Sequence, residues 1–153
     1  MIIAIIIVLI VAIVFGLKQS GHKKTLKSNP GDRAALIKLF NSCDAPSTYT
    51  EAAEYGIKYL ENNPNDYEIM NLSAYGFSKT KSGAGIRRLL DARINNLVSI
   101  VDNASKMREY VAKDKDFKSY AQNLFAYYAA ALSAFKETDK AKYYENKANA
   151  IKL

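Results

Sequence analysis

The chain has 153 residues, of which 49% are hydrophobic and 24% are charged, and its net charge is +7. This composition is that of a globular protein and argues against a disordered chain. A single cysteine, Cys43, cannot form an internal disulfide, which fits a reducing compartment.

Residues Met1–Leu17 form an apolar run without charge or proline. As a helix at about 1.5 Å per residue the run would be roughly 25 Å long, within the range that crosses a membrane. A cleaved signal peptide would have a basic segment before the run and a small-residue cleavage site after it, and we find neither pattern. We therefore predict an uncleaved transmembrane helix over residues 1–17. Basic residues follow the run and none precede it, so the positive-inside rule predicts a single-pass protein, N-terminus outside and helical domain cytoplasmic.

Residues 18–31 are predicted to form a basic linker beside the membrane. Its lysines are expected to be attracted to anionic lipid head groups or to an acidic partner. These lysines are Lys18, Lys23, Lys24 and Lys27. Four apolar residues of the preceding run are expected to contact lipid or neighbouring copies of the chain: Ile2, Ile6, Leu9 and Ile13.

Two segments share the pattern N-P-x-D, at residues 29–32 and 63–66, and their prolines are 34 residues apart. Counting Arg33 as the first position, the intervening residues fall into a repeat frame. The frame contains Leu36, Leu39 and Phe40 in a first helix, Tyr49 at the turn, Ala52 in a second helix, and Pro64. The stretch 33–66 resembles one tetratricopeptide repeat, which is two antiparallel helices followed by a proline-bearing turn.

The later segments are also predicted to be helical. Residues 67–83 resemble the first helix of a further repeat. Residues 85–112 and 117–136 are each predicted to form one long helix with an apolar stripe, and Tyr127 on the second stripe is expected to pack in the core. The last helix is expected to begin at Thr138 and again resembles a second repeat helix. The resemblance therefore covers one good repeat and two partial ones.

The predicted fold is all-α: an N-terminal transmembrane helix followed by stacked antiparallel helix pairs like those of tetratricopeptide repeats, over residues 32–153. That family binds many unrelated partners, so the resemblance alone does not specify a function. Some repeat proteins capture a carboxylate with Lys and Asn side chains on their concave face. The resemblance implies that Lys38, Asn41 and Asn71 project into this face as candidate partner-binding residues.

A second candidate site surrounds the glycine-containing turn at residues 82–85. Lys79, Lys81, Arg87 and Arg88 flank it, so a phosphate, an anionic lipid or an acidic partner are candidate ligands. The order of residues does not match a P-loop, and a loop between two helices is the simpler interpretation. We expect no binding to nucleic acid, because only this modest basic cluster is present.

Catalysis is not expected. The only histidine, His22, and the only cysteine, Cys43, lie far apart in the repeat frame, and the carboxylates are scattered, so we expect no metal, cofactor or catalytic residue. We expect a non-enzymatic, membrane-anchored helical-repeat protein that acts as an interaction scaffold or as a small structural subunit of a membrane complex. Its partners would be other protein chains, copies of itself and membrane lipid.

The alternative is a pilin-like filament subunit at the cell surface, whose N-terminal apolar helices pack in the core of the fibre. Type IV pilins begin with such a helix, but they usually carry Glu at the fifth mature position, where this chain has Ile5.

Overall fold

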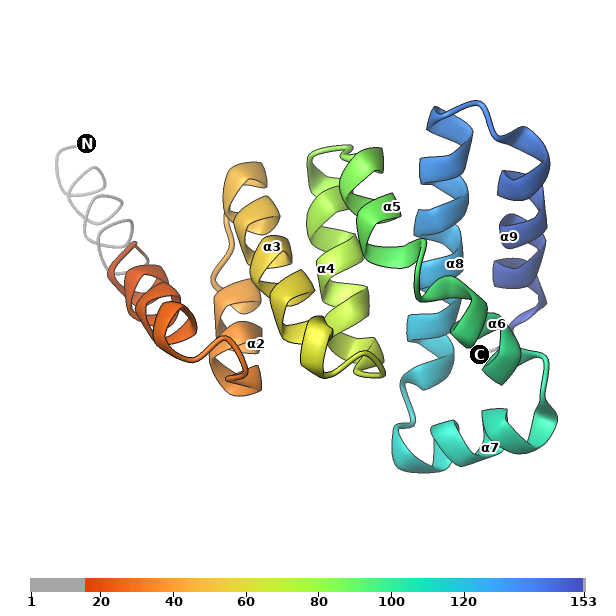
Figure 1. Ribbon diagram of the computed structural model, residues 1–153, viewed down its shortest axis with the longest axis horizontal. Coiled ribbons are helices and arrows are strands. Elements are labelled where there is room, and N and C mark those ends of the chain that lie inside the picture. Colours follow the sequence, from red (N-terminus) through yellow and green to blue (C-terminus); the bar gives the residue numbers. More distant parts are fainter. Residues whose placement is uncertain (1–15, 153) are drawn as a thin grey trace, which may run out of the picture.

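The structure is a computed structural model, and it describes residues 16–152. Every regular element in these residues is a helix, which confirms the all-α prediction. After a helical stretch at residues 16–28, the helices are α2 (Arg33–Asn41), α3 (Pro46–Asn62), α4 (Tyr67–Lys79), α5 (Gly83–Leu90), α6 (Ile94–Val101), α7 (Ala104–Lys113), α8 (Phe117–Ala134) and α9 (Thr138–Ala150). Figure 1 shows most of them side by side in a row from the N-terminal helix to α9, with α7 lying crosswise below α8.

The predicted transmembrane helix needs correction. Within residues 16–152, no helix combines the length and the apolar character needed to cross a membrane. This finding overturns the first part of the predicted fold class, and the structure supports an all-α fold alone. Most of the predicted span, residues 1–15, lies outside the described residues, as do Ile2, Ile6, Leu9 and Ile13.

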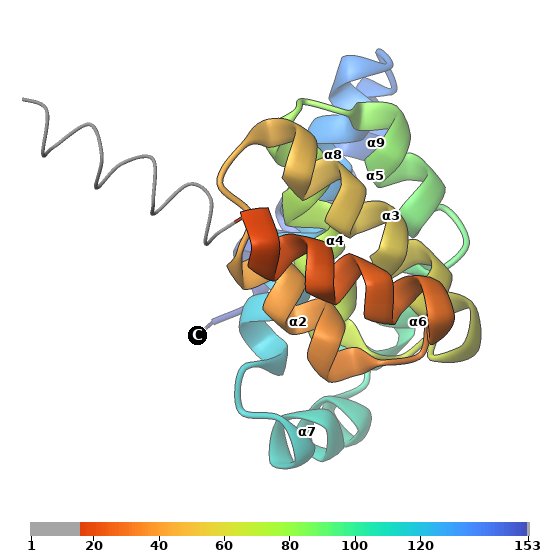
Figure 2. The ribbon, with the colours of Figure 1, turned by 90° about the vertical axis from the view of Figure 1, so that its left-hand side faces the viewer.

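The segment expected to be a basic linker is helical over residues 16–28 and packs on the domain. Leu26 is buried, and the side-chain amide of Gln19 donates a hydrogen bond to the carbonyl of Ser42 at the end of α2. Lys23 forms an ion pair of 2.6 Å with Glu51 of α3. This helix therefore lies across α2 and α3 at one end of the row (Figure 2).

Both N-P-x-D segments form turns that begin a helix. A carboxylate oxygen of Asp32 accepts the backbone N–H of Ala35 at 2.8 Å, and that of Asp66 accepts the N–H of Ile69 at 3.1 Å. Each aspartate thereby satisfies one of the unpaired N–H groups that every helix has at its start. The two motifs therefore start α2 and α4.

Helix α4 is at the centre of the packing, since it contacts α2, α3, α5 and α8. Its contact with α3 is close because glycines face the neighbouring helix. A Cβ atom on Gly76 would lie 2.6 Å from the carbonyl oxygen of Tyr49, and one on Gly56 would lie 1.9 Å from the hydroxyl of Ser73. Gly76 is thus required by the nearby backbone of α3, whereas Gly56 makes room for the side chain of Ser73.

The predicted long helix over residues 85–112 is wrong, because the structure has the three helices α5, α6 and α7 there. The first break follows Leu90, and the side chain of Arg93 donates to the carbonyl of Leu89 at 2.8 Å. At the second break the side chain of Asn103 accepts the N–H groups of Ser105 and Lys106, which starts a new helix. The last two helices match the prediction closely, with α8 beginning at Phe117 and α9 at Thr138.

Candidate functional site

The three residues suggested by the repeat resemblance lie on two neighbouring helices. Lys38 and Asn41 are exposed on α2, and Asn71 is half-buried on α4, which contacts α2. The side-chain oxygen of Asn71 is buried and accepts no hydrogen bond within the described residues. None of the three lines the hollows described below, so their role in binding stays a prediction.

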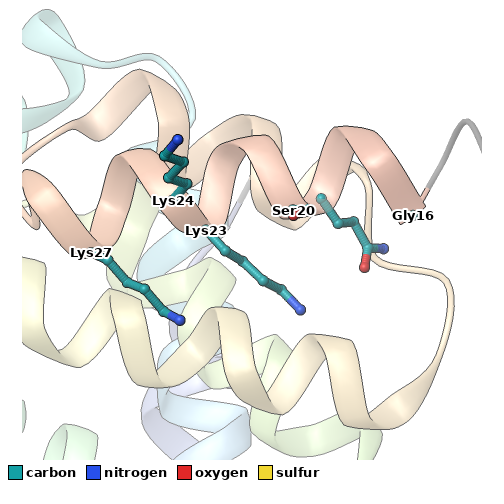
Figure 3. A pocket seen from close by; sticks show the side chains of 6 residues that line it. Gly16, Ser20, Lys23, Lys24 and Lys27 are labelled. Atoms are coloured by element: carbon teal, nitrogen blue, oxygen red, sulfur yellow. The ribbon is translucent and has the colours of Figure 1, made fainter.

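Three lysines of the N-terminal helix, Lys23, Lys24 and Lys27, line a hollow of about 350 Å³ together with Gly16, Gln19 and Ser20, whereas Lys18 is exposed outside it. Figure 3 shows Lys23 and Lys27 extending to one side of the helix and Lys24 to the other. The ion pair with Glu51 engages Lys23. The expected attraction of these lysines to lipid or to an acidic partner stays a prediction.

The four basic residues around the α4–α5 turn differ in their surroundings. Arg87 forms ion pairs of 2.6 Å with Glu137 and 3.4 Å with Asp91. Arg88 is paired with Glu54 of α3. The two arginines therefore join α5 to its neighbouring helices, and their charges are largely compensated.

The two lysines of the same cluster have no carboxylate partner within residues 16–152. The ammonium group of Lys79 lies 4.5 Å from the ring centre of Tyr75 and 6.0 Å from that of Tyr49. These two rings pack edge to face at 5.6 Å. The neighbouring phenol of Tyr75 raises the pKa of Lys79 above its ordinary value. Lys81 is exposed at the turn.

The backbone of Lys81 is in the left-handed region, with φ at 54°. The turn has the hydrogen bonds of a Schellman motif: the N–H of Ser82 donates to the carbonyl of Phe77 at 2.9 Å, and that of Lys81 donates to the carbonyl of Ser78 at 3.0 Å. Glycine usually occupies this position, because the left-handed conformation costs other residues about 1–2 kcal/mol. Lys136 has the same conformation after α8, with φ at 63°.

A hollow of about 230 Å³ lies between the α4–α5 turn and α8. We refer to it as the α4–α8 pocket. Its walls are mostly apolar, with the phenol ring of Tyr127 at one side, and partial burial raises the pKa of that tyrosine. The pocket is lined chiefly by Ser78, Lys81, Ile86, Tyr127, Ala130 and Ala134.

A second hollow, of about 660 Å³, lies between α8 and α9, and we refer to it as the α8–α9 hollow. Its α8 side consists of Ala126, Ala129, Ala130 and Ser133, and its α9 side includes charged residues of both signs. Ala130 lines both hollows, so they adjoin along one face of α8.

The two segments that form the α4–α8 pocket contain no acidic residue. Neither residues 69–90 nor residues 117–136 include an Asp or a Glu. They contain six cationic residues: Lys79, Lys81, Arg87, Arg88, Lys118 and Lys136. Of these, Lys81 lines the pocket, and neither Lys79 nor Lys81 is paired with a carboxylate within residues 16–152, so the uncompensated charge beside the pocket is that of these two lysines.

The residues lining the α4–α8 pocket include no carboxylate, histidine or cysteine. Cys43 is half-buried, and this burial raises the pKa of its thiol, which disfavours the reactive thiolate. Within residues 16–152, no group of three His, Cys, Asp or Glu side chains is placed to hold a metal ion.

The sequence analysis named Lys79 and Lys81 as candidates and did not name the face of α8. Tyr127 was expected to pack in the core because it falls on the apolar stripe of its helix. A usable signal was the row of alanines at 126, 130 and 134, four residues apart, in a segment without acidic residues.

Comparisons with protein-family models, with curated proteins and with solved structures found no match to this chain.

Proposed function

We propose that this chain is a non-enzymatic helical-repeat protein that binds a segment of a partner protein along the exposed face of α8. The observation that carries the proposal is the position of Ala130, which lines both the α4–α8 pocket and the α8–α9 hollow. The two hollows together form an extended recess over one helix, which suits a peptide or a helix better than a small compact ligand.

The small side chains of α8 support docking of a backbone. Ala126 and Ala130 are one helical turn apart, and Ala134 is one turn further, so they lie on the same face. Ala126, Ala130 and Ala134 are exposed. Small residues at a helix surface let another segment approach closely, and recognition of a helix in a groove is a recurring mode of peptide binding.

The way the helices are held also supports a binding platform. Ion pairs join helices across the row, as with Arg88 to Glu54 and Arg33 to Asp66 at 2.7 Å. The matching aspartate caps of α2 and α4, one repeat length apart, favour the repeat interpretation. A row of helices fixed in this way presents its recess with little need for rearrangement on binding.

The test is selection of peptides from a randomised twelve-residue displayed library on the full chain. We expect selected peptides to bind the native chain and to lose binding to Ala130→Trp, which places a bulky indole where the two hollows adjoin. Ala112→Trp on α7 is the matched control, since Ala112 is also exposed and lies outside both hollows. Selected peptides that bind the native chain, Ala130→Trp and Ala112→Trp equally would refute the proposal. Failure to select any peptide would also count against it.

A further inference from the structure

We propose that the α4–α8 pocket recognises an acidic segment of the partner and takes up one apolar side chain from it, with Lys81 contacting the acidic group. This inference rests on the proposed function and specifies the chemistry of its ligand.

Charge is the first reason. Of the four cations near the turn, Arg87 and Arg88 are paired with carboxylates of other helices, whereas Lys79 and Lys81 are not paired within residues 16–152. The walls of the pocket contain no acidic residue that could neutralise these lysines. An acidic ligand would therefore supply the missing counter-charge.

The apolar lining of the pocket is the second reason. Ile86, Ala130 and Ala134 contribute hydrocarbon surface, and Tyr127 adds an aromatic edge. The volume is about 230 Å³. A buried apolar cavity of about 150 Å³ accommodates benzene, so this pocket has room for one aliphatic or aromatic side chain. The adjoining α8–α9 hollow is less selective by charge, because Asp139 and Glu145 line it as well as Lys142.

The backbone of Lys81 is the third reason. A lysine occupies a left-handed position where glycine would be less strained, and its side chain lines the pocket. Strained backbone occurs at binding sites, but Lys136 has the same conformation at a turn outside the pocket. The support for a binding role of Lys81 is therefore the strained backbone together with its place in the pocket wall.

Lys136 provides an unusually close control. It has the same left-handed backbone, at the same position of a Schellman turn, and it carries the same charge. It does not line the pocket. Lys81→Gly and Lys136→Gly therefore remove equal charge and relieve equal strain, but only Lys81→Gly alters the pocket.

The experiment uses three fluorescein-labelled nine-residue peptides: four glutamates on each side of a central leucine, the same peptide with alanine at the centre, and lysines in place of the glutamates. Anisotropy titrations measure their affinity for the full chain and for the two glycine variants. We expect the glutamate–leucine peptide to bind best. Replacing its leucine by alanine should weaken binding about tenfold, and Lys81→Gly should weaken binding about fivefold. Lys136→Gly should leave the affinity nearly unchanged.

Thermal unfolding measurements test whether a loss of binding could be caused by a loss of folded structure. Both glycine variants should melt roughly 2–4 °C higher than the native chain, so a loss of binding in Lys81→Gly could not be due to a loss of structure. Equal losses in the two variants, no loss in Lys81→Gly, or equal binding of the lysine peptide would overturn the inference. The library experiment separates the two proposals. If the selected peptides lose binding to Ala130→Trp but are not acidic and bind Lys81→Gly as well as the native chain, the inference about the acidic ligand is refuted and the proposed function stands.

Discussion

Replacement of Gly76 by alanine gives a direct test of the packing between α3 and α4. The added Cβ would lie 2.6 Å from the carbonyl oxygen of Tyr49 and 3.1 Å from the Cβ of Ala53. The carbonyl belongs to the backbone of α3 and cannot rotate away, so the two helices must move apart. Overpacking of this kind costs about 1–3 kcal/mol, and the better helix propensity of alanine offsets up to about 1 kcal/mol of that cost.

We therefore expect Gly76→Ala to lower the free energy of unfolding by about 1–2 kcal/mol. For a chain of this size that corresponds to a fall in melting temperature of roughly 2–8 °C. Circular dichroism at 222 nm during thermal and urea unfolding measures the change. Gly21→Ala is the control, because nothing lies within 4 Å of the added Cβ in that exposed helix, and it should stabilise by about 0.5–1 kcal/mol. If Gly76→Ala were as stable as Gly21→Ala, the close approach of α3 and α4 would be incorrect.

Two further predictions concern the acidic caps and the buried tyrosines. Asp32→Ala removes a helix cap and should lower the free energy of unfolding by about 1 kcal/mol. Asp66→Ala should lower it by about 2–3 kcal/mol, because Asp66 also accepts hydrogen bonds from an arginine and a tyrosine of other helices. Urea unfolding midpoints measure both, and equal losses would contradict the contacts of Asp66. Burial and nearby carboxylates raise the pKa of Tyr120 to about 12 from its ordinary value of 10.0. Since the folded state then holds the proton more tightly, stability should be full below pH 10 and fall up to about pH 12. Tyr120→Phe should reduce that fall in urea titrations at pH 9 and 11, and an unchanged fall would show that other groups cause it.

Local sequence signals predicted the starts of several helices well, because capping acts within a few residues. The aspartates of the two N-P-x-D segments begin α2 and α4 by accepting N–H groups three residues ahead. The helical period of residues 117–136 likewise predicted α8 within two residues of its end. Each of these signals depends on neighbours in the chain, so no knowledge of the fold is needed to interpret it.

The break after Leu90 shows where such signals fail. Apolar residues continue at helical spacing across it, so periodicity alone favours one helix. The structure ends α5 there, and the side chain of Arg93 reaches the carbonyls of Leu89 and, at 3.5 Å, Leu60 of α3. A contact with a residue 33 positions earlier is set by the packing of helices, and the sequence pattern does not contain it.

The candidate site depends on the same kind of distant contact. In the sequence, Lys79, Lys81, Arg87 and Arg88 form one basic cluster of equal candidates. In the fold their surroundings differ. Carboxylates 34 residues before Arg88 and 50 residues after Arg87 compensate the charges of the two arginines, whereas the charges of the two lysines are not compensated within residues 16–152. In such a cluster, only the basic side chains that have no carboxylate partner in the folded chain are available to bind an acidic ligand. Here those charges lie beside an apolar pocket whose other wall, α8, begins at Phe117, 36 residues after Lys81.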